Sequence, residues 1–366
     1  MALRFGIEEE YFVVDPVSRE VVPRAEAVVR RAEAVLGDRA STELVSFLAE
    51  AKTPPCDDLA KLTEQVRSMR AAMAAAAERE GVRLAASGTP VLGELLPPPI
   101  AAGARYADSL ATYRALDDEQ CICSCHVHVE MPDRDRAVRV GNHLRPWLPV
   151  LLALAANSPY WAGRDTGHAC WRVLSWSRWP VAGPPPLFES AAHYDDVVAA
   201  LLGCGALMDH GTIFWDVRPS ARLPTIEVRL GDVARTTGDA AVFAALVRAL
   251  VQVSLAAVED GAAPPDPSAE MLRAAYWLAA RDGLTGRALD LRTGRPAAAA
   301  DLVRDLLRHV RPALDDSGDL AAVTAGVAAL LESGNGADRQ RAVFRRRGLL
   351  TDVVDDVLLS PAPEGG

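Results

Sequence analysis

Lysine is almost absent from this chain of 366 residues: Lys52 and Lys61 are the only two, and arginine supplies the remaining positive charge. No G-x-x-x-x-G-K-[ST] motif occurs, which excludes a P-loop. Acidic residues outnumber basic ones and give a formal net charge of −10, so no basic stripe is available to make nucleic acid the main partner. Any phosphate bound here must be held by metal ions, arginine and backbone amides.

The chain also lacks the cysteine pairs and long apolar runs that mark other protein classes. Its six cysteines include no C-x-x-C pair, so we expect no zinc site and interpret them as buried reduced thiols of a cytoplasmic protein. Charged residues interrupt the N-terminal segment, and the longest uncharged run, residues 146–163, contains three prolines. We therefore expect neither a signal peptide nor a membrane span.

Residues 6–15 alternate apolar and polar side chains with a period of two, which predicts a β-strand. Glu8 and Glu10 share one face of this strand, and apolar residues dominate the other. Two carboxylates on one strand face repel each other unless a cation or a proton lies between them. A divalent metal held by oxygen ligands is the simplest explanation, and such metals usually carry phosphate.

Later segments repeat the pattern of one apolar and one ionisable face. The ionisable residues that share a face in these segments are His126, His128 and Glu130, then Glu227 and Arg229, with Asp216 and Arg218 as a weaker case. A sheet face that is merely solvated would more often carry Thr, Lys, Ser and Gln. We therefore predict a sheet with a charged concave surface that forms a functional site.

Strand and helix patterns are interleaved through residue 238, and helical periodicity dominates from residue 240 to residue 359. No βαβ fingerprint is visible, so we expect an α+β fold with a curved, largely antiparallel sheet and flanking helices. We assign residues 1–238 to a catalytic, sheet-containing region and residues 239–366 to a helical part of the same domain. The apolar back of that helical part is compatible with a homodimer.

Five motifs occur in this order along the chain: G-I-E-E-E at residues 6–10, H-V-H-V at 126–129, N-S-P followed by G-R-D-T-G at 157–167, W-D-V-R-P-S at 215–220 and T-I-E-V-R at 225–229. In these motifs the chain resembles the carboxylate–amine ligases of the bacterial and plant glutamate–cysteine ligase type 2 family, over about residues 4–356. The resemblance implies a glutamine-synthetase-like fold and ATP-dependent amide formation through an acyl phosphate. Its default small-molecule substrates are L-glutamate as the carboxylate and L-cysteine as the amine.

The resemblance also implies roles for individual residues. The implied ligands of the Mg²⁺ ions that bridge the ATP phosphates are Glu8, Glu10, Glu43, Glu50, His126 and Glu227. The implied catalytic residues are Arg229 and Glu50, the ATP-binding residues Arg229 and Arg218, and the substrate-binding residues Arg164, Arg172 and His128. The spacing of Glu43 and Glu50 would place them on opposite strand faces, so we expect a bend or bulge between them. His128 has a second interpretation, as a donor that orients a metal ligand.

The chain departs from the family pattern at a few positions. Ser124 and Glu130 stand where members commonly carry glycine, and Lys52 adds a cation beside the acidic pair. None of these changes removes a core ligand, so we expect the chemistry to be kept and the specificity to differ. Three alternatives stay open: a ligase of the same fold that uses another amine in a specialised pathway, a phosphotransferase, and a nucleotide-binding protein without ligation.

Overall fold

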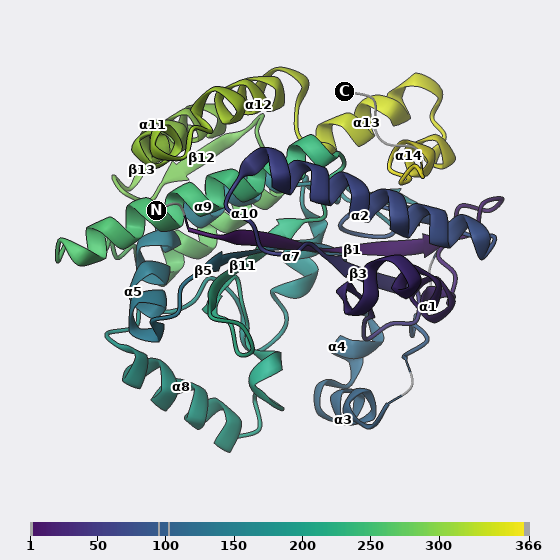
Figure 1. The fold of residues 1–366 in the computed structure, drawn as a ribbon, viewed down its shortest axis with the longest axis horizontal. Helices are drawn as coiled ribbons and strands as arrows, with labels where there is room; N and C mark the ends of the chain where they lie inside the picture. The colour runs from purple at the N-terminus through teal and green to yellow at the C-terminus, as the bar shows by residue number, and fades with distance from the viewer. Residues whose placement is uncertain (1–2, 94–95, 102, 362–366) are drawn as a thin grey trace.

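The computed structural model describes residues 3–93, 96–101 and 103–361, and its centre is a sheet of seven antiparallel strands (Figure 1). Six strands follow the order β10-β11-β5-β1-β3-β2, and β4 pairs with the far end of β1. The strands of this sheet are β1 (Phe5–Val14), β2 (Ala40–Thr42), β3 (Leu48–Lys52), β4 (Arg83–Ala85), β5 (Ser124–Glu130), β10 (Val217–Pro219) and β11 (Thr225–Asp232). The expected α+β class and antiparallel sheet are confirmed.

Helices cover both faces of the sheet. Figure 1 shows α2 and α9 to α12 on one side of the sheet, and α3, α4 and α8 on the other. The helices are α1 (Ala25–Leu36), α2 (Leu59–Arg79), α3 (Ala104–Tyr113), α4 (Ala115–Asp118), α5 (Arg134–Leu144), α6 (Leu148–Ala155), α7 (Trp171–Trp176), α8 (Ala191–Gly203), α9 (Thr237–Glu259), α10 (Ala269–Asp282), α11 (Ala299–Ser317), α12 (Leu320–Ser333), α13 (Gly336–Arg347) and α14 (Leu350–Asp356). Short 3₁₀ helices span Gly37–Arg39, Arg145–Trp147 and His210–Thr212.

The main core lies between the apolar face of the sheet and the helices packed on it. Ile7 of β1, Val127 of β5 and Val228 of β11 are at most 1% exposed and belong to one cluster with apolar residues of α2, α6 and α9. Their alternation with the ionisable residues follows from the two-residue period of a strand. One face of the sheet is thereby fixed in the core, and the charged face is turned away from it.

Helix α9 is the longest apolar element in the described part of the chain. By length and composition alone it could cross a membrane, but 61% of its most apolar window is buried inside the protein. It packs against β5, α2 and α11, as the core helix of a folded domain does.

Local breaks divide some of the segments predicted from the sequence. The helical pattern over residues 134–156 is interrupted by the 3₁₀ turn Arg145–Trp147, where Pro146 cannot donate a helical hydrogen bond. Residues 239–366 also contain a hairpin, β12–β13, that helical periodicity did not predict. The remaining short strands are β6 (Tyr160–Trp161), β7 (Arg164–Asp165), β8 (Ala182–Gly183), β9 (Phe214–Trp215), β12 (Arg287–Asp290) and β13 (Arg295–Ala298).

Candidate active site

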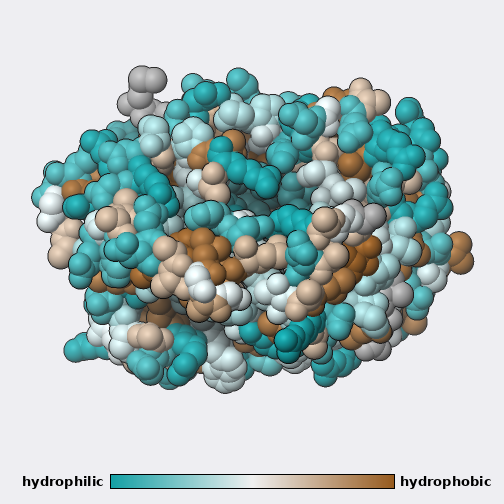
Figure 2. Space-filling view, turned by 90° about the horizontal axis from the view of Figure 1, so that it is seen from below, coloured by the Kyte–Doolittle hydropathy of each residue, from teal (hydrophilic) through white to brown (hydrophobic). Residues whose placement is uncertain are grey.

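The charged face of the sheet lies on the side of α3, α4 and α8, and Figure 2 looks onto that side of the molecule. A hollow lies near the centre of this view; hydrophilic residues surround it directly, and apolar groups lie farther out. Strand register places ionisable residues opposite one another: Glu8 of β1 pairs with His126 of β5, and His128 pairs with Glu227 of β11. Side chains that are cross-strand neighbours on one face lie close enough to share a ligand.

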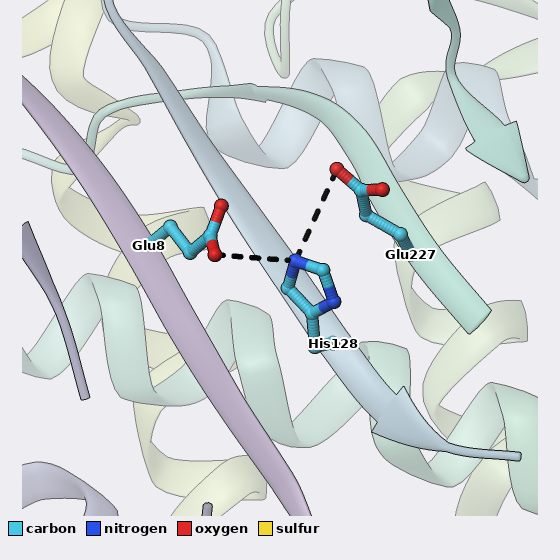
Figure 3. A group of neighbouring side chains, drawn as sticks. All are labelled: Glu8, His128 and Glu227. Atoms are coloured by element: carbon cyan, nitrogen blue, oxygen red, sulfur yellow. Dashed lines mark ion pairs between the residues drawn. The ribbon is translucent and has the colours of Figure 1, made fainter. Parts of the chain in front are cut away.

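Glu8, His128 and Glu227 form the first carboxylate group, with one ligand atom from each lying within 4.8 Å of the others (Figure 3). Nε2 of His128 is 3.6 Å from Oε1 of Glu8 and 3.9 Å from Oε1 of Glu227. On the other side of the ring, Nδ1 is hydrogen-bonded to the hydroxyl of Thr225 at 2.9 Å. Nε2 is buried without a hydrogen-bond partner among the described residues, so a divalent cation fits between it and the two carboxylates.

The two carboxylates of the first group carry the negative charge that a cation site requires. Burial favours the neutral form of Glu227, but the neighbouring Arg229 and Arg218 outweigh it and hold the pKa of Glu227 well below its usual range. Burial likewise opposes ionisation of Glu8, and the neighbouring His126 and His128 rings lower the Glu8 pKa instead. Both carboxylates are therefore ionised at neutral pH.

Arg218 and Arg229 hold Glu227 from two sides. Nε of Arg218 donates to Oε2 of Glu227 at 2.9 Å, and Arg229 forms an ion pair with Oε1. The two guanidinium groups come from β10 and β11, which are paired strands, and they line the edge of the first group. Guanidinium groups of this kind are able to bind phosphate as well as carboxylate.

Glu10, Glu43 and Glu50 form the second carboxylate group, whose ligand atoms also lie within 4.8 Å of one another. The chain reaches this arrangement by the expected bend, at Leu44, followed by a turn between two separate strands. Residues 43–47 connect β2 to β3, and the antiparallel pairing of these strands returns Glu50 to a position opposite Ser41. Glu43 follows directly after β2, so the turn brings it beside Glu50.

Crowding of carboxylates in the second group opposes full ionisation. Burial and the neighbouring Glu50 and Glu10 raise the pKa of Glu43 well above its usual range. Burial also raises the pKa of Glu10. Lys52, at 3.5 Å from Oε1 of Glu50, supplies one nearby positive charge. A divalent cation here would relieve the repulsion that otherwise keeps a proton on the group.

His126 lies between the two carboxylate groups and is not a member of either. Its Nε2 is 2.7 Å from the hydroxyl of Ser124, and its Nδ1 is 3.6 Å from Oε2 of Glu8. Burial and the nearby Arg229 lower the pKa of His126 to about 4, so the ring is neutral at pH 7. The structure thus places both histidines against Glu8 and Glu227: Nδ1 of His126 is 3.9 Å from Oε1 of Glu227, the same distance as Nε2 of His128, which was predicted as a substrate-binding residue.

The structure does not bring Arg172 or Arg164 into either group. Arg172 is 2% exposed, and its Nε donates to Oδ1 of Asp232 at 2.7 Å while its Nη2 donates to carbonyls of β11. Its Nε and Nη2 are therefore occupied by contacts within the protein. Arg164 is exposed on the β6–β7 hairpin, where its guanidinium carbon lies 5.9 Å from the centroid of the Trp171 ring.

Sequence reasoning did not single out Asp232, although its carboxylate is the shared partner of Asn157, Ser158 and Arg172. The backbone N–H of Asn157 and the hydroxyl of Ser158 donate to its Oδ2 at 2.6 and 2.7 Å, and Arg172 pairs with its Oδ1. This network explains the N-S-P motif as a structural element. The available signal was an acidic residue at the end of β11, next to the apolar positions of that strand.

Glu130 lies at the end of β5, opposite Thr225 of β11. Its Oε2 accepts a hydrogen bond from the backbone N–H of Arg4 at 3.4 Å. This contact ties the carboxylate to the chain segment that enters β1. Glu130 is therefore at the edge of the charged face.

Comparisons with known proteins identify the family of the chain. The sequence model of the family described as glutamate–cysteine ligase family 2 matches residues 4–356. A protein of Saccharopolyspora erythraea named "Putative glutamate--cysteine ligase 2-1" is 45% identical over 362 residues, covering 99% of this chain and 96% of the relative. One of Mycobacterium sp. strain KMS, named "Putative glutamate--cysteine ligase 2-2", is 46% identical over 355 residues, covering 96% of each.

Among solved structures, glutamate–cysteine ligase from Francisella tularensis in complex with AMP superposes with a TM-score of 0.72. The match covers 98% of this chain and 88% of that one, at 12% sequence identity. This likeness confirms the expected ligase fold with its antiparallel sheet and flanking helices. With the family match over nearly the whole sequence, the chain belongs to glutamate–cysteine ligase family 2.

Proposed function

We propose that this protein joins a carboxylate to an amine through an acyl phosphate, with L-glutamate and L-cysteine as the default substrates and Mg²⁺ as the cofactor. Its family membership makes it an ATP-dependent ligase. The observation that carries the finer proposal is the pairing of two carboxylate groups on one sheet face, with the buried Nε2 of His128 in the first. Such groups suit a reaction in which several anions must approach one another.

The donor sets fit magnesium better than softer metals. Five of the six members of the two groups are carboxylates, and oxygen is the ligand that Mg²⁺ prefers. Glu8, His128 and Glu227 would hold one ion, and Glu10, Glu43 and Glu50 another. When bound, these ions would neutralise phosphate charge and hold the triphosphate in place.

The chain's own cations complete the charge balance. ATP and the substrate carboxylate are both anionic, and their approach requires compensating charge beyond that of the metal. Arg229 is held against Glu227 at the edge of the first group, where a small displacement would let it contact a phosphoryl oxygen. Arg218 shares that carboxylate and keeps it ionised while Arg229 moves.

The proposed reaction balances in two steps. An oxygen of the substrate carboxylate attacks the γ-phosphorus of ATP, the bond to the β-γ bridging oxygen breaks, and ADP leaves. The amine nitrogen then attacks the carbonyl carbon of the acyl phosphate, inorganic phosphate leaves with the C–O bonding electrons, and the amine loses a proton. The product is an amide, and no oxidant or reductant is needed.

The deciding experiment is ADP release by the full chain with ATP and Mg²⁺ across a grid of carboxylates and amines, with the mass of each product recorded. We expect release that depends on both glutamate and cysteine, together with a γ-glutamyl amide. An amide from another amine would retain the ligase and replace the default substrate. Phosphate transferred to an acceptor, or silence across the whole grid with a folded protein, would contradict the proposed ligation.

A further inference from the structure

Ser124 connects Glu10 of the second carboxylate group to His126, which lies beside the first group. It begins β5, and its backbone N–H and its hydroxyl contact the same oxygen of Glu10, Oε2, at 2.7 and 2.8 Å. The same hydroxyl lies 2.7 Å from Nε2 of His126. Ser124 is 4% and His126 5% exposed, so bulk water does not compete for these contacts.

Donor and acceptor chemistry gives these contacts a direction. Nη1 of Arg229 lies 3.4 Å from Nδ1 of His126 and Oε2 of Glu8 lies farther away, at 3.6 Å; because a guanidinium can only donate, we infer that Nδ1 accepts from Arg229. A neutral imidazole then carries its hydrogen on Nε2, which donates to the hydroxyl oxygen of Ser124. The single hydroxyl hydrogen of Ser124 is left to donate to Glu10. All three hydrogen bonds therefore point the same way.

We propose that Ser124 is a positioning residue, which closes a directed hydrogen-bond relay from Arg229 through the His126 ring to Glu10. The two donors of Ser124 occupy Oε2 of Glu10, and in the described part of the chain no donor contacts Oε1. Oε1 is thereby left to face a cation of the second group. This inference rests on the proposed function, because that function places a cation there.

Through the relay, the position of Arg229 beside the first group affects the position of Glu10 in the second. Arg229 contacts Glu227 of the first group as well as His126, so a displacement of its guanidinium toward a phosphate would be felt at Glu10. Partners that orient a metal ligand commonly change metal affinity 10- to 100-fold when they are removed. When the Ser124 side chain is cut back to alanine, the backbone N–H still donates to Glu10, so we expect the lower end of that range.

The test measures Mn²⁺ binding to the full chain by electron paramagnetic resonance, with Ser124→Ala as the main variant. We expect one of two bound ions to bind about 10-fold more weakly and the other to be unchanged. Glu50→Gln identifies the ion of the second group, because it removes a ligand charge there alone. Ser254→Ala is the matched control: Ser254 is a buried serine of α9, 2% exposed, whose hydroxyl has no hydrogen-bond partner among the described residues.

A second pair of variants guards against a purely structural effect. Ser124→Thr keeps the hydroxyl and Ser124→Val removes it at nearly the same volume, so threonine should bind Mn²⁺ about 10-fold more tightly than valine. Nitrogen-15 spectra of the histidine rings in the metal-free protein should show the Nε2–H tautomer for His126, assigned with His126→Gln. An Nδ1–H tautomer, or equal Mn²⁺ affinities for the threonine and valine variants, would overturn the relay.

The outcomes separate the relay from the proposed function. If the unaltered protein binds no Mn²⁺ at either group, the assignment of the metal groups fails, and the positioning role of Ser124 falls with it whatever the ring tautomer. If both ions bind and the Ser124→Ala variant matches the Ser254→Ala control, the metal groups stand and only the relay is refuted.

Discussion

Replacing Glu8 and Glu227 one at a time separates two roles of the first carboxylate group: binding a cation, and compensating the charge of Arg218 and Arg229. Both residues face Nε2 of His128, so Glu8→Gln and Glu227→Gln each remove a charged ligand from the same cation position. We expect each change to lower turnover by about 10²-fold or more, which corresponds to about 3 kcal/mol of lost transition-state stabilisation. Loss of turnover alone would not distinguish them.

Stability distinguishes the two variants. Glu227 is the shared partner of Arg218 and Arg229, whose side chains are 10% and 16% exposed. Removing one partner of a buried ion pair costs about 3–5 kcal/mol, because the remaining charge stays buried without compensation. Among the described residues, the ion-pair partners of Glu8 are two imidazole rings at 3.6 Å, so Glu8→Gln should lower the free energy of unfolding by less than Glu227→Gln does.

The assay combines urea unfolding in EDTA with ADP release at saturating Mg²⁺. The expected pattern is a folded but inactive Glu8→Gln protein and a destabilised, inactive Glu227→Gln protein. Near-normal ADP release by Glu8→Gln would refute the metal assignment of the first group. Equal stabilities of the two variants would refute the assigned dependence of the arginines on Glu227.

Three further predictions concern the surroundings of the site. Asp232→Asn should lower the free energy of unfolding by about 3–5 kcal/mol, measured by urea titration, because it leaves Arg172 buried without its partner; an unchanged midpoint would contradict the structural role given to that pair. Burial raises the pKa of Asp216 from 3.8 to about 6, so the folded state holds this proton more tightly than the unfolded state. The stability that this proton contributes is complete below pH 3.8 and is lost as the pH rises through about 6, by on the order of 3 kcal/mol. Asp216→Asn should therefore make the urea midpoint depend less on pH between pH 4 and 7. Adding Mg²⁺ at 100 times its dissociation constant should raise the free energy of unfolding by about 2.7 kcal/mol for each occupied site, seen as a higher melting temperature that EDTA reverses; no shift would argue against both carboxylate groups as cation sites.

The charged face of the sheet was predictable because strand periodicity is strict. Alternation along β1, β5 and β11 assigns each residue to a face without knowledge of the partner strand. The sequence therefore predicted that Glu8, His128 and Glu227 would share one surface. It could not predict which ring nitrogen of each histidine faces the carboxylates, because that depends on cross-strand register and on the hydroxyls of Ser124 and Thr225.

Other features depended on contacts between distant parts of the chain. The meeting of Glu43 with Glu50 required a turn between β2 and β3 in addition to the bend or bulge that sequence spacing indicated. Arg172 was assigned to substrate from a motif, and only tertiary packing places its guanidinium against Asp232 in the core. Motif order identifies a family, whereas the role of each charged residue within it depends on what packs behind the strand.

The buried pair of Glu9 and Arg70 helps to fix the register on which the site depends. Glu9 points to the apolar face of β1 and is fully buried, with Arg70 of α2 donating to both of its oxygens at 2.9 and 2.6 Å and Tyr11 donating at 2.7 Å. A slip of β1 by one residue would turn Glu9 to the charged face and carry Glu8 into the core. Breaking the pair should therefore affect the site as well as stability.

A double-mutant cycle tests this account. Arg70→Met alone should cost about 3–5 kcal/mol of unfolding free energy, because it leaves the Glu9 carboxylate buried without its cation. Glu9→Leu combined with Arg70→Met should recover most of that loss, since a buried ion pair can often be replaced by apolar residues at little cost. If register depends on the pair, the double variant will bind Mn²⁺ more weakly than the unaltered protein although its stability is restored. Full recovery of both stability and Mn²⁺ affinity would show that apolar packing alone aligns β1 with its neighbours.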